Sequence, residues 1–371
     1  MIMEFVVERK EFLDALNIGA SMAGKRKVLP ILDNVKIKID GTNAQLSSYD
    51  SEIAVSKSVD ILRSSEDGVF LVNAKDLTNA LRSIKDDEIT FTLDKMILHL
   101  KYKNGVIKLP YESADEFPKP NIERDNRVTF VVNSQLVYSM LSDARNFVYK
   151  KDNLYPQLSC VCLYLRQGKI GVVSTDRNME YKAEYEYGYD GQDLNVLITY
   201  NAIPSLLGLL SCSSNINISD SERNVLFRNE SGMLVSVKPE SVFPKMAFTM
   251  GDSEMPIHVS LKRIELVDAI NRCSISTSTT SPNIAIKVTE DNLQLRTEDL
   301  MGNKSTVENV PCECVGGTIE IGFNAAYLLQ CLSVFSEETI YLLLESPIKM
   351  GIMLDNVNDK RKTMLMPCVI V

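Results

Sequence analysis

The chain of 371 residues is poor in the residues and motifs of catalysis. Its two histidines, His99 and His258, lie in separate segments, and we interpret both as structural. The phosphate-binding pattern G-x-x-x-x-G-K-[ST], the dinucleotide pattern G-x-G-x-x-G and the nucleophile pattern G-x-S-x-G are all missing. No histidine or cysteine spacing is typical of a metal site. We therefore expect a protein that is not an enzyme and that has no catalytic residues, no cofactor and no metal.

Long apolar runs and an excess of basic charge are missing too. No run approaches the roughly 18 apolar residues of a membrane-spanning helix, and charge comes too early for a secretory signal. The net charge of −9 excludes a generally basic nucleic-acid coat. The C-x-C pairs Cys160/Cys162 and Cys312/Cys314 do not have the zinc-knuckle spacing C-x2-C. We expect all eight cysteines to be reduced thiols of a cytoplasmic protein.

Three short signatures recur along the chain: an aspartate that ends a strand, a proline that opens one, and an apolar residue followed by proline. They occur at Asp50, Asp176 and Asp299; at Pro30, Pro156 and Pro282; and at Phe117-Pro118, Phe243-Pro244 and Met366-Pro367. The gaps are 126 and 123 residues for the first and third signatures, and 126 twice for the second. A three-residue deletion between Pro282 and Asp299 reconciles them. The chain is therefore predicted to contain three similar units of roughly 124 residues, a common domain size.

The domains are predicted at 1–122, 128–248 and 254–371. Polar linkers containing proline or glycine, at 118–127 and 248–256, mark the two boundaries.

Each unit has the pattern helix, strands, helix, strands. The apolar spacing predicts first helices at 9–22, 133–147 and 260–274, and second helices at 74–84, 200–211 and 323–335. Asn133 or Ser134 is a plausible N-cap. Asp40-Gly41 and Asn104-Gly105 predict tight hairpin turns. The fold class is α+β, with two helices packed on antiparallel sheet in each unit.

Basic and acidic residues are unevenly distributed. Six helical segments, taken as 9–27, 74–85, 134–151, 200–212, 259–273 and 323–334, carry a net charge of +8, which leaves −17 for the rest. The basic clusters are Lys25-Arg26-Lys27 and Lys150-Lys151. A short basic run by itself is commonly a solvated helix end. Together with acidic surroundings, it favours one basic face that suits a phosphate backbone. Because no base-reading motif is present, binding would be independent of sequence.

The chain resembles a known family, the bacterial DNA polymerase III β subunit or replication sliding clamp. The resemblance covers the full length. It rests on LPIL at 29–32, Thr175-Asp176, DEFPKP at 115–120, GFNAAYLLQCL at 322–332 and MLMP at 364–367. The usual family ending Met-Pro-Met-Arg-Leu is replaced here by Met-Pro-Cys-Val-Ile-Val.

The resemblance implies a head-to-tail homodimeric ring of six domains around double-stranded DNA. Helices would line the hole, and a continuous sheet would form the outside. Such a ring tethers a polymerase and raises its effective concentration at the primer end, without chemistry of its own. The implied partners are DNA, the DNA polymerase III alpha subunit, a clamp loader and other proteins with a clamp-binding motif. The implied place is the cytoplasm.

The resemblance also implies a pocket between the second and third domains that takes a short peptide. The matching positions are Leu158, Thr175, Met179, Pro244, Met364, Met366 and Pro367. Methionines suit a site that accepts many related peptides. The alternative is that these are core residues of two adjoining domains. Arg177 stands where glycine is common in the family.

For DNA, Arg26 matches the basic loop position of the family, with Lys25 and Lys27 beside it. Lys150 and Lys151 form the second basic cluster, and Tyr155 belongs to the loop of the second domain that approaches DNA. The implied dimer interface brings Ile107 and Leu109, on an edge strand, against the region of Ile275 in the other chain. Pairing across subunits would cover that edge.

Two rival hypotheses remain at this level. The first is a repeat-built scaffold that binds only proteins, with no closed ring and no dependence on DNA. The second is a hydrolase or transferase, which would need a clustered acid, base or metal site.

Overall fold

The computed structural model describes residues 3–26, 29–121, 127–150, 154–244, 255–278, 282–299, 302–355 and 360–370. The chain forms two compact units. Unit 1 contains residues 1–139 and 198–240, and unit 2 contains residues 140–197 and 241–371. The division passes through the middle third of the chain. None of the helices in the described ranges is long and apolar enough to cross a membrane.

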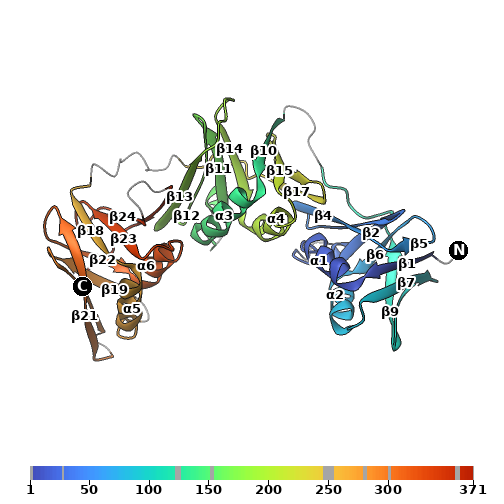
Figure 1. Cartoon of the computed structure of the whole chain (residues 1–371), viewed down its shortest axis with the longest axis horizontal. Coiled ribbons are helices and arrows are strands. Elements are labelled where there is room, and N and C mark those ends of the chain that lie inside the picture. The colour runs from blue at the N-terminus through green and yellow to red at the C-terminus, as the bar shows by residue number, and fades with distance from the viewer. Residues whose placement is uncertain are drawn as a thin grey trace. The chain divides into compact units, whose positions relative to one another are not determined.

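One order of elements occurs three times along the chain: strand, helix, four strands, helix, three strands (Figure 1). The first repeat contains β1 Met3–Glu8, α1 Arg9–Gly19, β2 Asn34–Asp40, β3 Asn43–Tyr49, β4 Ile53–Asp60, β6 Gly68–Asn73, α2 Ala74–Ser83, β7 Glu88–Asp94, β8 Ile97–Tyr102 and β9 Gly105–Ser113, with an additional short strand β5 Arg63–Ser64. The second repeat contains β10 Val128–Asn133, α3 Ser134–Ala144, β11 Cys160–Arg166, β12 Lys169–Thr175, β13 Met179–Glu186, β14 Leu194–Thr199, α4 Ile203–Leu210, β15 Asn215–Asp220, β16 Asn224–Asn229 and β17 Gly232–Val237. The third repeat contains β18 Ile257–Lys262, α5 Arg263–Ser274, β19 Asn283–Val288, β20 Asn292–Asp299, β21 Lys304–Val315, β22 Ile319–Asn324, α6 Ala325–Leu332, β23 Thr339–Leu344, β24 Gly351–Leu354 and β25 Arg361–Leu365.

The predicted interval of 126 residues is confirmed by the element bounds. Strands β2, β3, β4 and β6 begin and end 126 residues before β11, β12, β13 and β14. The short 3-10 helices Pro30–Asp33 and Pro156–Ser159 have the same interval. In the third repeat, β19 begins directly after Pro282, whereas β11 begins four residues after Pro156. The three-residue deletion therefore falls at this turn.

Unit 1 is built on a 13-stranded antiparallel sheet in the order β10-β15-β16-β17-β4-β3-β2-β6-β9-β8-β7-β1-β5. β17 of the second repeat pairs with β4 of the first, so the sheet runs through the junction between repeats. Helices α1, α2 and α4 pack on one face of this sheet (Figure 1). The core beneath α1 is aromatic: the rings of Phe5 and Phe91 stack with centroids 4.7 Å apart, and Phe12 packs 5.3 Å from Phe91.

Unit 2 is built on a 12-stranded sheet in the order β14-β11-β12-β13-β25-β24-β23-β18-β21-β20-β19-β22. β13 of the second repeat pairs with β25 of the third, which is the same type of junction. We call the sheet face away from the helices the outer face. It carries apolar clusters of its own, one around Leu71 and Phe117 in unit 1 and one around Cys162 and Leu197 in unit 2.

The bounds of several elements differ from those predicted. Helix α1 ends at Gly19, three residues earlier than predicted. Gly19 lies against strand β3, where a Cβ would be 2.5 Å from the carbonyl oxygen of Leu46. The two hairpin loops are Gly41-Thr42 and Lys103-Asn104, each one residue away from the predicted pair. The N-cap prediction is confirmed for Asn133, whose Oδ1 accepts a hydrogen bond from the backbone N–H of Leu136 at 3.0 Å.

Candidate functional site

Four of the seven predicted pocket residues meet where β12, β13 and β25 lie side by side. In the ladders, Thr175 is opposite Glu180, and Glu180 is opposite Met364. The next pair along is Met179 with Leu365, and the backbone N–H of Met366 then donates to the carbonyl oxygen of Asn178 at 2.8 Å. The geometry thus joins the second and third repeats at the predicted position.

The turn between β12 and β13 is held by side-chain hydrogen bonds. Thr175 Oγ1 donates to the carbonyl oxygen of Met179 at 2.7 Å and accepts from the N–H of Arg177 at 3.0 Å. Asp176 Oδ1 accepts from the N–H groups of Asn178 and Met179 at 2.9 and 2.8 Å. Arg177 has a φ of +81°, a left-handed conformation that favours glycine.

The first repeat contains the same turn, 126 residues earlier. Asp50 Oδ1 accepts from the N–H groups of Glu52 and Ile53 at 3.0 and 2.7 Å, and Ser51 has a φ of +82°. The aspartate that ends a strand in each repeat is therefore a turn-forming residue, and its recurrence has a structural cause.

The other three predicted pocket residues are more widely spread. Leu158 is buried, and its carbonyl oxygen accepts from the N–H of Tyr149 at 2.9 Å. Pro367 lines a cavity of about 400 Å³ with Ile348 and Val369, whose exposures of 81% and 79% make this an apolar surface. Pro244 lines a separate cavity on the outer face. A third, smaller cavity of about 180 Å³ contains Met179.

Sequence reasoning missed several residues at this junction. Asn178, Tyr327 and Gln330 share the smaller cavity with Met179. The most unusual residue is Glu180, because its Oε1 is buried and has no hydrogen-bond partner. Burial raises the pKa of Glu180 to about 8, and the charge of Lys182 only partly opposes that effect. The alternation along β13 marks Glu180 as an outward-facing residue, but no sequence pattern shows that β25 lies beside it.

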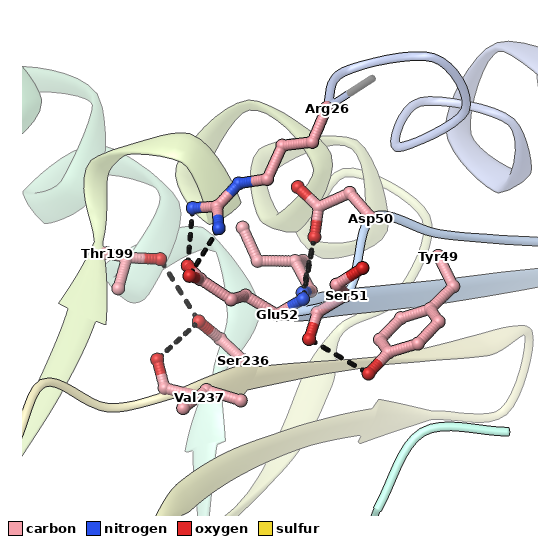
Figure 2. Close-up of polar contacts among 9 residues, drawn as sticks. Arg26, Tyr49, Asp50, Ser51, Glu52, Thr199, Ser236 and Val237 are labelled. Carbon is pink, nitrogen blue, oxygen red and sulfur yellow. Dashed lines mark hydrogen bonds and ion pairs between the residues drawn. The ribbon is translucent and has the colours of Figure 1, made fainter. Parts of the chain in front are cut away.

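Of the predicted DNA-facing residues, Lys25 and Arg26 are described in unit 1. Lys25 is exposed, whereas Arg26 makes a two-pronged ion pair with Glu52, which is held in turn by Asp50 (Figure 2). The hydrogen bond to Glu52 is the main reason that the pKa of Arg26 is raised, against the opposing effect of burial. The charge of Arg26 is therefore largely balanced within the chain. Lys27 lies outside the described residues.

In unit 2, Lys150 is exposed and Tyr155 is 37% exposed. The ring of Tyr155 stands edge-on to Tyr149 at 6.1 Å, and the guanidinium of Arg177 lies 5.1 Å from its centre. Tyr155 therefore connects the predicted DNA-facing loop to the turn at the β12–β13 junction. Lys151 lies outside the described residues.

The prediction that the helices themselves are basic is wrong. With the observed bounds, the six helices carry no net charge, since the predicted segments extended past the helix ends. The described basic residues Lys25, Arg26 and Lys150 lie in the turns that follow α1 and α3. Cations beyond a helix C-terminus complement its dipole, so the position by itself does not require a ligand.

Two of the three predicted dimer residues, Ile107 and Leu109, lie on β9, whereas Ile275 is the C-cap residue of α5. Both β9 and β21 of the third repeat are half-open strands. Residues 105–110 of β9 pair with β8 on one side, and residues 304–311 of β21 pair with β20 on one side. Neither stretch has a ladder partner on its other side within the described ranges. The side chains of Ile107 and Leu109 pack against the core of their own repeat, so this edge offers mainly its backbone. Ile275 is 73% exposed.

The described residues contain no group of three His, Cys, Asp or Glu side chains placed to hold a metal ion. All eight cysteines are free thiols. Burial raises the pKa of Cys160 to about 12 and that of Cys312 to about 11, so neither is poised as a nucleophile.

Comparison with known proteins agrees with this architecture. Residues 3–122 match the family described as the N-terminal domain of the DNA polymerase III beta subunit, and residues 252–369 match its C-terminal domain. The beta sliding clamp of Pseudomonas aeruginosa is 22% identical, over 98% of this chain and 99% of the relative. That of Staphylococcus epidermidis is also 22% identical, over 99% of both.

Solved structures show the same fold. The DNA polymerase III beta subunit of Thermotoga maritima superposes with a TM-score of 0.92 at 18% identity and covers 100% of both chains. A sliding clamp of Pseudomonas aeruginosa, solved with a ligand, gives 0.91 at 21% identity, over 99% of this chain and 100% of that one. With three repeats of one element order and family matches at both ends, the chain belongs to the DNA polymerase III beta subunit family, the beta sliding clamps.

Proposed function

We propose that two copies of this chain close head to tail into a ring around double-stranded DNA and hold the replicative polymerase on it. The chain is a sliding clamp, a processivity factor and not a catalyst. The observation that carries the ring is the pair of half-open strands, β9 in the first repeat and β21 in the third. Two such edges in one chain can pair with the opposite edges of a second copy, which satisfies their backbone groups and removes an aggregation hazard.

We place the three clamp domains at 1–122, 128–248 and 254–371, with the dimer contact at residues 105–110 and 304–311 and with Ile275 nearby. The partners are the DNA polymerase III alpha subunit, a clamp loader and other proteins with a clamp-binding motif. The protein would work in the cytoplasm. Tethering needs no chemistry, since it acts by raising the concentration of the polymerase at the primer end.

The partner groove would lie at the β12–β13–β25 junction. It would be formed by Thr175, Met179, Met364, Met366 and Pro367, with Leu158 and Pro244 at its borders. Its support is the strand pairing of Glu180 with Thr175 and Met364, together with the exposed apolar C-terminal residues. Flexible methionines suit a groove that accepts several peptides.

DNA contact would come from Lys25 and Lys150, with Lys27 and Lys151 beside them and Tyr155 nearby. Arg26 would contribute less than its charge suggests, because Glu52 already binds it.

The ring is tested by small-angle X-ray scattering with an absolute mass. We expect about 83 kDa, twice the 41.6 kDa of one chain, with the distance distribution of a hollow disc. A particle of 41.6 kDa at high concentration would contradict the ring and favour a protein-binding scaffold.

The groove is tested by deleting Met366–Val371. We expect stimulation of the polymerase to be lost while the mass of the ring stays unchanged. Unchanged stimulation would refute the groove, and a lost ring would show that the deletion acts through assembly instead.

The DNA face is tested by Lys25→Glu, with Lys38→Glu as the matched control on the exposed side of β2. Lys25→Glu should slow loading onto DNA, and the effect should grow as salt is lowered. Equal loading of the two variants at low salt would remove Lys25 from the DNA face.

A further inference from the structure

A cavity of about 630 Å³ lies on the outer face of β11, β12 and β13 in unit 2. Its volume is within the range of sites that bind small ligands or peptide side chains. It is lined by Cys162, Tyr164, Arg166, Gln167, Lys169, Val173, Lys182, Glu184, Asp193, Asn195 and residues 242–244. Of the residues proposed for the partner groove, only Pro244 lines it, so the cavity is a separate site beside that groove.

Most of the residues that line this cavity differ from their counterparts in the first repeat, and Cys162 is one of those that differ. Lys36 of the first repeat corresponds to Cys162 of the second, and Phe117 corresponds to Phe243, each 126 residues apart. Lys36 extends over Phe117, with its Nζ 6.0 Å from the ring centre. The short side chain of Cys162 leaves the equivalent space beside Phe243 open.

Tyr164 is the central side chain of the cavity wall. Its ring crosses Gly171, where a Cβ would come within 2.4 Å of the tyrosine ring and hydroxyl. The hydroxyl donates to Glu184 Oε2 at 2.9 Å. Burial, together with the charge of Glu184, raises the pKa of Tyr164, so the hydroxyl stays protonated and continues to donate. The wall is therefore fixed before any ligand arrives.

Cationic groups surround this wall. Lys169 and Lys182 share the carboxylate of Glu184, at 3.0 and 3.5 Å. The guanidinium of Arg166 lies 5.4 Å from the centre of the Tyr164 ring and donates to the neutral amide oxygen of Asn195 at 2.7 Å. Arginine has five N–H donors in a fork that matches a carboxylate. With Asp193 the lining has three cations and two acids, a net charge of +1.

The floor is apolar. Cys162, Val173 and Phe243 belong to one cluster with Leu197. An occupant should therefore place an apolar side chain on this floor and a carboxylate toward Arg166 and Lys169. The exposed segment at 242–244 is one wall, so access is from solvent, alongside the proposed groove.

We propose that this cavity binds an acidic, apolar-containing peptide segment of a partner protein, as a second contact beside the groove. The assignment does not depend on the groove, because the two sites share only Pro244.

The probe is a fluorescein-labelled hexapeptide, Asp-Leu-Asp-Phe-Asp-Leu, measured by fluorescence anisotropy with the full-length protein. The control peptide replaces each aspartate with asparagine. We expect the acidic peptide to bind more tightly, with an affinity that falls as salt rises. Cys162→Lys, which copies the first repeat, should weaken binding by about tenfold or more, because it fills the cavity. Arg166→Gln should weaken it about tenfold through the loss of a charge-assisted hydrogen bond.

Three further variants keep the test decisive. Lys36→Cys at the equivalent position of the first repeat should leave binding unchanged, and so should Met366→Ala in the groove. If Cys162→Lys does not fold, Cys162→Leu fills the same space without adding a charge. Equal binding of the two peptides, or unchanged binding to both cavity-filling variants, would overturn the proposal. A larger loss with Met366→Ala would assign the peptide to the groove. Displacement of the peptide by a single-stranded oligonucleotide would assign the cavity to nucleic acid instead.

Discussion

The outer faces of the first and second repeats differ, although their strands correspond residue for residue. In the first repeat, Leu71 and Phe117 form a filled apolar cluster, and Lys36 extends over the phenylalanine ring. In the second repeat, Leu197 and Phe243 take the corresponding places, but a cavity of about 630 Å³ lies beside them. The difference shows that a sheet can gain a binding surface from a few outward-facing residues without any change in the lengths of its strands.

The largest difference should appear on removal of the two phenylalanines. Phe117→Ala should lower the free energy of unfolding by about 3 kcal/mol, because a buried aromatic ring leaves a cavity. Phe243→Ala should cost only about 1 kcal/mol, since its ring is partly exposed and already borders open space. Denaturant unfolding checks both, and equal losses would mean that Phe243 is as tightly packed as Phe117.

The next difference concerns Gly171 and its counterpart Gln45. Gly171→Ala should cost about 2 kcal/mol, because its Cβ would meet the Tyr164 ring at 2.4 Å and the carbonyl oxygen of Ala183 at 2.6 Å. Gln45→Ala, on an exposed position of β3, should stay within about 0.5 kcal/mol. Thermal unfolding of the two variants measures the contrast. A neutral Gly171→Ala would show that Tyr164 can move aside.

A smaller, pH-dependent difference concerns Glu180 and its counterpart Ala54. Burial raises the pKa of Glu180 to about 8 from 4.5, so the fold favours the protonated carboxyl. The contribution of the Glu180 carboxyl to stability is complete below 4.5, the pKa of the unfolded chain, and is lost as pH rises through about 8, the pKa in the fold. Glu180→Gln should therefore raise stability at pH 9 by on the order of 2 kcal/mol and leave it nearly unchanged at pH 4.

Melting temperatures across this pH range provide the measurement, and Ala54→Gly in β4 is a control whose effect should not depend on pH. A Glu180→Gln effect that is the same at pH 4 and pH 9 would mean that the carboxyl ionises normally in the folded chain.

The smallest effects should come from the two left-handed turn residues. Ser51→Gly should stabilise the protein by about 0.5 kcal/mol, because serine is strained at a φ of +82°. Arg177→Gly should gain less, since it also removes the contact of the guanidinium with Tyr155. Calorimetry can show which of the two variants gains more stability. A loss of stability in Ser51→Gly would mean that the greater conformational entropy of glycine in the unfolded chain outweighs the relief of strain in the fold.

Much of the fold could be predicted from the sequence, because its signatures are local. The recurring aspartates form turns with their own neighbours, and Asn133 caps its own helix. The C-terminal end of α1 and the residues at the β13–β25 junction could not be predicted from local patterns. Gly19 meets Leu46, and Glu180 meets Met364, across 27 and 184 residues of chain. The basic charge lies in the turns beyond the helices, because the predicted segments extend past the observed helix ends.

The junctions between repeats are made by β4 with β17 and by β13 with β25. Their connecting hydrogen bonds join main-chain groups, which are the same for almost every amino acid. The strand pairing at such a junction therefore depends little on which side chains the paired residues carry. Most residues can therefore be substituted, as the 22% identity to a relative shows, while the fold of the chain stays the same. Residues on the outer face can then be substituted one by one without a change in the strand pairing.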